Sequence, residues 1–137
     1  MSKRFLVAIG LGMLVACGGG GGTTGANPPP PPPPPLATPP GDVGFTIVDN
    51  AFVDPDGNRN QQAKITMTAG QMAGWIHDGA NIHTVTFTTV PSGAMTNDSG
   101  NLRNGDTFLQ TLATPGTYTF HCSIHPDIMK GVTIIVN

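Results

Sequence analysis

The chain has 137 residues, the length of one small domain, and its 19 glycines and 14 prolines are concentrated enough near the front that much of that part is not expected to pack. Six basic and eight acidic residues give a formal net charge of −2. No basic run or patch is present that could neutralise phosphates, which excludes a nucleic-acid partner, and the acids are too scattered to form an acidic docking tail.

Residues 1–16 have the pattern of a lipoprotein signal peptide. Lys3 and Arg4 precede an apolar run from Phe5 to Ala16, which has signal-peptide length and is too short to span a bilayer. The run closes with Leu-Val-Ala before Cys17, which looks like a bacterial lipobox, so we expect cleavage before Cys17 and lipid on that cysteine. The alternative is an ordinary secretory signal beside a chance cysteine. With the lipid, the protein is exported, periplasmic or at the cell surface, and anchored to a membrane.

Lipid on Cys17 changes the expectation for the other cysteine. Two cysteines in an exported chain otherwise suggest a disulfide. Once Cys17 is acylated, Cys122 has no partner, and a lone thiol in an oxidising compartment is open to oxidation unless a metal occupies it. Cys122 is therefore a candidate metal ligand.

Residues 17–40 read as a tether that follows the lipidated cysteine. A glycine tract at 18–22 predicts a flexible leash, and a proline tract at 28–35, continued by Pro39 and Pro40, predicts an extended rod of roughly 3 Å per residue. The alternative is a ligand for SH3-like or WW-like modules, which are not expected outside the cytoplasm. Residues 41–137 remain for the folded domain.

Short runs rich in Val, Ile, Thr and Phe recur between turn signals after residue 40. The predicted strands are 43–49, 63–68, 72–77, 82–88, 107–113, 117–122 and 132–136. Residues 52–62 contain Pro-Asp-Gly-Asn and predict a turn or a ragged edge. Seven to eight strands at this spacing, with no amphipathic helix, predict an all-β fold, an antiparallel β-sandwich of two sheets.

Strand alternation predicts where two chemically distinctive side chains lie. In residues 117–122, Cys122 shares a face with the aromatic side chains, and in residues 82–88, His83 shares a face with Val85. Both continue core-facing rows, so we expect them inside the sandwich at one end.

Cys122, His125 and Met129 fall within eight consecutive residues between two predicted strands. His83, in Asn-Ile-His-Thr-Val-Thr-Phe, supplies the second imidazole. Soft sulfur with imidazole suits copper better than calcium or magnesium, which prefer oxygen ligands. Four protein ligands leave no position for substrate, so the pattern favours a carrier over an enzyme.

These residues resemble the cupredoxin family, the small blue-copper proteins such as plastocyanin, amicyanin and azurin, over roughly residues 43–137. The motifs are a tryptophan followed by His-Thr-Val-Thr-Phe (75–87), P-G-T-Y-x-F-x-C-x-x-H-P (115–126) and M-x-G (129–131). The resemblance implies the Greek-key form of the sandwich and one type 1 copper ion. The spacing from the second histidine to the methionine varies in the family. Here it is four residues, longer than in amicyanin and shorter than in plastocyanin.

Carried over by position, the resemblance implies His83, Cys122, His125 and Met129 as the metal ligands. It also implies that electrons enter and leave through redox partner proteins at the solvent edge of His125, beside Ile124 and other apolar residues.

Four further residues have predicted roles or positions. We expect Thr84 to join the His83 and Cys122 segments by hydrogen bonds, with an ordinary strand threonine as the alternative. His121 lies on the face opposite Cys122, as a surface histidine or a second electron port. His77 is expected at the surface or near the site without being a ligand, and Trp75 in the core.

The leading hypothesis is a monomeric, membrane-tethered type 1 copper protein that carries single electrons. Copper delivery or sequestration by the same ligands is the first alternative. A metal-free or zinc-holding structural domain is the second.

Overall fold

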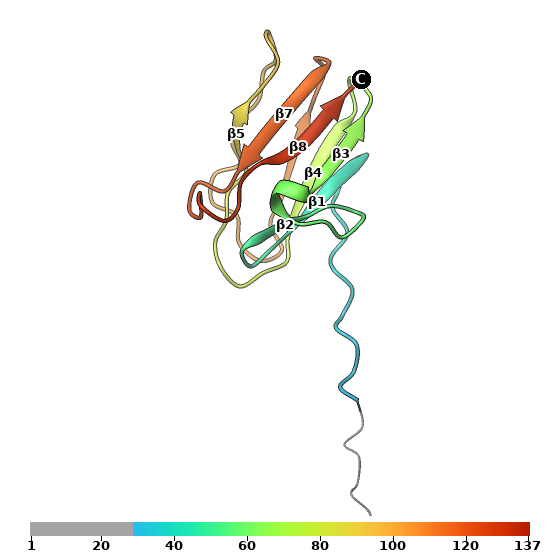
Figure 1. The fold of residues 1–137 in the computed structure, drawn as a ribbon, viewed down its shortest axis with the longest axis vertical. Coiled ribbons are helices and arrows are strands. Elements are labelled where there is room, and N and C mark those ends of the chain that lie inside the picture. The colour runs from blue at the N-terminus through green and yellow to red at the C-terminus, as the bar shows by residue number, and fades with distance from the viewer. Residues whose placement is uncertain (1–28) are drawn as a thin grey trace, which may run out of the picture. The chain divides into compact units, whose positions relative to one another are not determined.

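Eight strands in two four-stranded sheets make up the part of the chain that the computed structural model describes, residues 29–137 (Figure 1). The strands are β1 (Val43–Val48), β2 (Ala51–Val53), β3 (Lys64–Met67), β4 (Met72–His77), β5 (Thr86–Thr89), β6 (Thr107–Thr111), β7 (Gly116–His121) and β8 (Val132–Val136), with a 3-10 turn, η1 (Asn60–Gln62), between β2 and β3. The strand orders are β2-β1-β4-β6 and β3-β8-β7-β5. The predicted signal peptide and Cys17 lie outside the described residues.

The predicted all-β sandwich is confirmed, but its sheets are mixed rather than purely antiparallel. β1 pairs with β4 in parallel, as does β3 with β8, and the other four pairings are antiparallel. Parallel neighbours need a crossover connection instead of a hairpin. The chain crosses to the other sheet at β3 between β1 and β4, and local sequence patterns do not report such a crossing. No helix among residues 29–137 has the length and apolar character needed to cross a bilayer.

The predicted strand at 82–88 begins later than expected. Only Thr86–Thr89 forms β5, whereas His83 pairs with Leu102 in an isolated bridge, with N···O distances of 3.1 and 2.8 Å. The apolar alternation of this segment is real, because Val85 is buried. Its first residues are held by a loop and not by a neighbouring strand, so periodicity alone overestimates the strand.

The predicted turn at 52–62 contains the short edge strand β2, followed by a turn built on Asp54. The buried carboxylate of Asp54 accepts backbone N–H groups from Asp56, Asn58 and Lys64 at 2.9 to 3.0 Å. These charge-assisted bonds satisfy the carboxylate and close the turn between β2 and β3.

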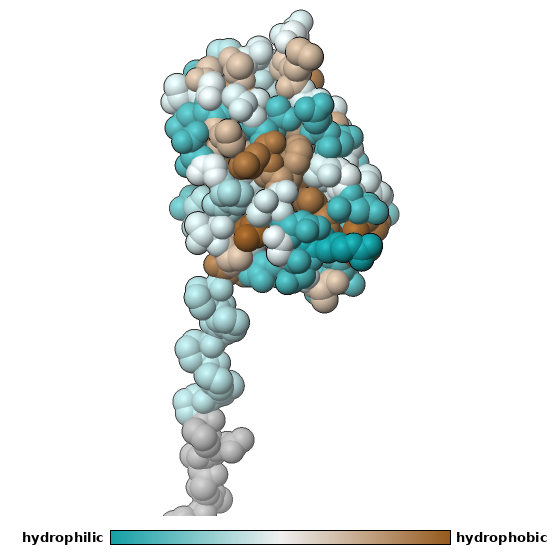
Figure 2. All heavy atoms as spheres, turned by 180° about the vertical axis from the view of Figure 1, so that it is seen from behind, coloured by the Kyte–Doolittle hydropathy of each residue, from teal (hydrophilic) through white to brown (hydrophobic). Residues whose placement is uncertain are grey.

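Aromatic rings from both sheets fill the interior, beneath a surface on which hydrophilic and hydrophobic residues are intermixed (Figure 2). Phe120 of β7 packs edge-on against Phe45 of β1 at 5.2 Å and against Trp75 of β4 at 5.4 Å between ring centroids. Trp75 is fully buried, as predicted. Edge-to-face pairs of this kind add to the burial of large apolar area. The same buried cluster extends to Cys122 and Met129, so the core continues up to the candidate site.

Residues 37–41 cross the outer face of the β1–β4 pair as a strap. Pro39 lies against Gly44, and Pro40 lies against Gly74, where a Cβ atom on either glycine would collide with the proline above it. The two glycines are neighbours in the β1–β4 register and leave room for the strap. Residues from Ala37 onward therefore pack on the sheet.

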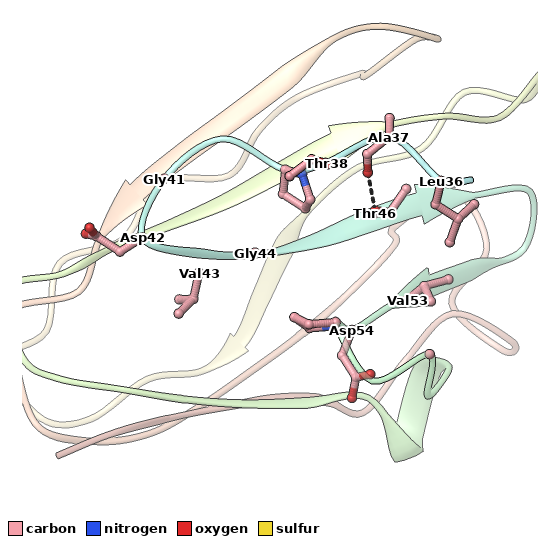
Figure 3. A pocket seen from close by; sticks show the side chains of 13 residues that line it. Leu36, Ala37, Thr38, Gly41, Asp42, Val43, Gly44, Thr46, Val53 and Asp54 are labelled. Carbon is pink, nitrogen blue, oxygen red and sulfur yellow. Dashed lines mark hydrogen bonds between the residues drawn. The ribbon is translucent and has the colours of Figure 1, made fainter. Parts of the chain in front are cut away.

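Hydrogen bonds fix both ends of the strap. Ala37 N–H donates to Asp78 Oδ2 at 3.0 Å. The Thr46 hydroxyl donates to Ala37 O at 2.8 Å (Figure 3). At the other end, Asp42 N–H donates to Met72 O at 2.9 Å. The strap thus runs antiparallel to β4, from the end of that strand to its beginning. A groove of about 470 Å³ lies between the strap and residues 53–57 (Figure 3).

Candidate metal centre

Three of the predicted site residues meet at one end of the sandwich. Cys122 Sγ lies 3.6 Å from His83 Nδ1 and 3.7 Å from His125 Nδ1. One donor atom from each residue can be chosen so that all three lie within 4.8 Å of one another, and no other such group of His, Cys, Asp or Glu occurs in residues 29–137. Both histidines present the same ring nitrogen to the sulfur. Cys122 and His83 are fully buried and His125 is half-buried.

Strand ends position the two buried residues. Cys122 follows the last residue of β7, and the antiparallel β5–β7 pairing sets His121 opposite Thr86. His83 lies three residues before Thr86 and is anchored by its bridge to Leu102. Residues far apart in sequence are therefore brought together by backbone pairing and not by mobile side chains.

The loop that carries the other two site residues is closed by its own backbone. Cys122 N–H donates to Met129 O at 2.8 Å, His125 N–H donates to Cys122 O at 3.2 Å, and Met129 N–H donates to His125 O at 3.0 Å. Met129 is fully buried and belongs to the same apolar cluster as Cys122. The loop thus holds a thiol, an imidazole and a thioether in a fixed relation.

Thr84 connects the His83 segment to the Cys122 segment. Its N–H donates to Cys122 Sγ at 3.4 Å, its hydroxyl oxygen accepts Ser123 N–H at 2.8 Å, and the two hydroxyls are hydrogen bonded at 2.9 Å. Sequence reasoning did not identify Ser123; a hydroxyl residue directly after the cysteine was the available signal.

His77 is buried beside the site. Its ring stacks on His83 with centroids 5.2 Å apart and planes 24° apart, and its Nδ1 accepts Gly79 N–H at 3.2 Å. The sequence analysis expected His77 either at the surface or near the site. The position near the site is confirmed, and the surface position is wrong. The reason is that His77 ends β4 on the same inward face as Trp75.

His121 lies outside this cluster. Its Nδ1 is hydrogen bonded to the Thr88 hydroxyl at 2.8 Å, across the β5–β7 pair, and the side chain is half-buried. It stands on the face of β7 opposite the buried Tyr118 and Phe120, as alternation predicted.

Burial shapes the electrostatics of His83. Desolvation lowers the pKa of its imidazole, and repulsion from His125 and His77 lowers it further, whereas the carboxylate of Asp49 acts in the opposite direction. A neutral imidazole keeps a lone pair on one nitrogen, which is the form that binds a metal.

The donor set and its surroundings fit one type 1 copper ion. Thiolate, two imidazoles and a nearby thioether, all attached to hydrogen-bonded backbone, match the ligand preference of copper in trigonal sites with a weak axial sulfur. Around the half-buried His125, Ile124 and Ile128 are 45% and 52% exposed. The loop that carries His125 therefore exposes two large apolar side chains to solvent.

Comparison with known proteins gives one family match. A profile described as copper binding proteins of the plastocyanin/azurin family matches residues 54–137. No curated protein sequence matches the chain.

Solved structures share the fold. A purple cupredoxin from Nitrosopumilus maritimus superposes with a TM-score of 0.54 at 21% identity, over 70% of this chain and 100% of its own. An oxidised amicyanin variant gives a TM-score of 0.55 at 21% identity, over 69% of this chain and 81% of its own. A copper-containing nitrite reductase from Thermus scotoductus gives a TM-score of 0.56 at 23% identity. The match covers 69% of this chain but only 22% of the enzyme.

Proposed function

The chain belongs to the plastocyanin/azurin family of copper-binding proteins, and from that premise we propose that it carries single electrons on one type 1 copper ion. The observation that carries the proposal is the buried cluster in which Cys122 Sγ lies 3.6 and 3.7 Å from the Nδ1 atoms of His83 and His125. Copper bound there would supply a one-electron couple.

Each residue has a distinct part in this proposal. Cys122 would provide the sulfur ligand, which also accepts the Thr84 N–H, and His83 and His125 would provide the two imidazoles. Met129, buried in the same cluster, would provide a thioether as the fourth donor. The two oxidation states of copper prefer different geometries. Donors fixed by strand ends and a closed loop move little between the states, which favours fast electron transfer.

A carrier fits the site better than an enzyme does. All four donors come from the protein, so no position is left for a substrate, and residues 29–137 hold one such cluster. The match to the nitrite reductase that shares the fold covers only 22% of that enzyme, so most of the enzyme has no counterpart in the match. The likeness to that enzyme therefore supports the fold alone.

Electrons are proposed to pass through the exposed edge of His125. Ile124 and Ile128 beside it offer an apolar surface on which a redox partner protein can dock with little desolvation cost. We further propose that the protein acts as a monomer outside the cytoplasm, held at a membrane by lipid on Cys17. The lipobox-like run before that cysteine supports this anchor.

Visible absorption tests the copper site. Adding Cu(II) to the protein without residues 1–17 should give an intense blue thiolate-to-copper band, and Cys122→Ala should abolish it. His121→Gln is the matched control, because His121 adjoins Cys122 but lies outside the cluster, and it should leave the band intact. A colourless, weakly absorbing complex would refute the type 1 site.

Copper delivery uses the same donors and needs a separate test. A carrier should exchange electrons rapidly between its oxidised and reduced forms and should give up copper slowly to a competing chelator. Slow self-exchange with rapid loss of copper would favour delivery or sequestration instead.

A further inference from the structure

The buried imidazole of His83 lies between a sulfur and a carboxylate. Its Nδ1 faces Cys122 Sγ at 3.6 Å, whereas its Nε2 has no hydrogen-bond partner and lies 3.9 Å from Asp49 Oδ1. A fully buried nitrogen without a partner is costly, so the group that it faces needs an explanation. Asp49 directly follows β1, far from the other site residues in sequence.

Asp49 is fixed by the loop that leads to His83. Its Oδ1 accepts the N–H groups of Ala80 and Asn81 at 2.8 and 2.9 Å. Gly79 lies against it so closely that a Cβ on that residue would stand 2.7 Å from the same Oδ1. The carboxylate therefore has a set position relative to the segment that carries the imidazole, although its side chain is 41% exposed.

We propose that Asp49 is a positioning residue for the metal centre, whose carboxylate holds the proton of His83 on Nε2 and so keeps the lone pair of Nδ1 directed at Cys122. The proposal rests on the proposed function, in which Nδ1 is the nitrogen that binds metal. Metal-bound histidines commonly direct their second ring nitrogen at a carboxylate, which sets the tautomer and the ring orientation. A separation of 3.9 Å exceeds a direct hydrogen bond, so in this arrangement the carboxylate acts through its charge.

The surroundings make Asp49 the group that can do this. Among the charged groups of the described residues that act on the pKa of His83, His125 and His77 are cationic when ionised, and Asp49 is the anion. His77 stacks on the ring face and offers no acceptor to Nε2.

A fixed negative charge behind the imidazole stabilises the more positive oxidation state of a bound metal. Asp49→Asn removes the charge but keeps an oxygen for Ala80 and Asn81. It should weaken Cu(II) binding by about 10- to 100-fold. Cu(I) binding should weaken less, and the reduction potential should rise. Asp56→Asn is the matched control, because it removes the same charge from an exposed turn.

Two measurements test the proposal. In the metal-free protein, ¹H–¹⁵N NMR of the imidazoles should show His83 as the Nε2–H tautomer in the wild type and in Asp56→Asn, and a mixture of tautomers in Asp49→Asn. Competition with chelators should give the affinities for Cu(II) and Cu(I). Thermal unfolding checks that each variant is folded, and the charge-retaining Asp49→Glu should lie closer to the wild type than Asp49→Asn in both measurements.

The outcomes separate this proposal from the proposed function. An unchanged tautomer and unchanged Cu(II) affinity in Asp49→Asn, in a protein whose wild type shows the blue band, would overturn the role of Asp49 and leave the copper site standing. A wild type without the band would refute the copper site, while the tautomer of the metal-free protein would still decide what Asp49 does to His83.

Discussion

Replacing Thr84 by valine removes one hydroxyl from the junction between the two halves of the metal centre and changes little else in shape. The hydroxyl is hydrogen bonded to the N–H and the hydroxyl of Ser123 at 2.8 and 2.9 Å, and Thr84 itself is 5% exposed. Its longer contacts, to Thr86 Oγ1 at 3.3 Å and Cys122 Sγ at 3.9 Å, contribute less. Each of the two shorter bonds contributes about 0.5–1.5 kcal/mol net. Because Ser123 is exposed and water can replace part of the loss, we expect Thr84→Val to lower the free energy of unfolding by about 1–2 kcal/mol.

Thermal unfolding of the metal-free protein, followed by circular dichroism, measures this loss without the contribution of bound copper. For a domain of this size the expected change is a fall in Tm of about 5–15 °C. Thr88→Val is the control, since its exposed hydroxyl bonds only His121, and it should cost less than about 0.5 kcal/mol. A double-mutant cycle with Ser123→Ala should show coupling of about 0.5 kcal/mol or more. Wild-type stability in Thr84→Val would refute the view that this hydroxyl joins the two segments.

Three further outcomes are expected. Burial lowers the pKa of His83, so as pH falls below about 6.5 the unfolded chain takes up a proton before the folded protein does, and the metal-free protein should lose stability until the folded pKa is passed. Urea unfolding between pH 8 and 5 should show a smaller loss of stability with falling pH in His83→Gln than in the wild type. An equal loss in both proteins would contradict this prediction. Met129→Leu should keep the blue band but raise the reduction potential in voltammetry, because an axial donor to Cu(II) is lost; an unchanged potential would argue against Met129 as a ligand. Cys17→Ser should release the protein from the membrane fraction with its blue band intact, and continued tight retention would contradict the lipid anchor.

The part of the site that is formed by residues close together in the sequence was predicted best. Cys122, His125 and Met129 are near neighbours in the chain, and strand alternation placed Cys122 and His83 at core-facing positions, where the structure has them buried. Alternation works here because one face of each strand packs on aromatic rings.

What the sequence missed depends on pairing between distant segments. The parallel neighbours β1 and β4 bring Gly44 beside Gly74, and nothing local to either glycine indicates that prolines will pack there. The same pairing sets the end of β1 beside the loop before His83, which is why Asp49 could not be placed near the site. His77 was difficult for a related reason, since a histidine at a strand end is buried or exposed depending on what the next loop covers.

The strap has a mechanical consequence. It enters the fold at Ala37, bonded to Asp78, at the end of β4 from which the chain continues to His83. Tension along the chain before Ala37 would therefore be applied at the end of the domain that holds the metal centre. The strap lies lengthwise on β1 and β4. A force that pulls Ala37 along the direction of the strands would therefore act in shear on the contacts of Pro39 and Pro40 at the same time. A domain held in this way resists detachment of its first residues.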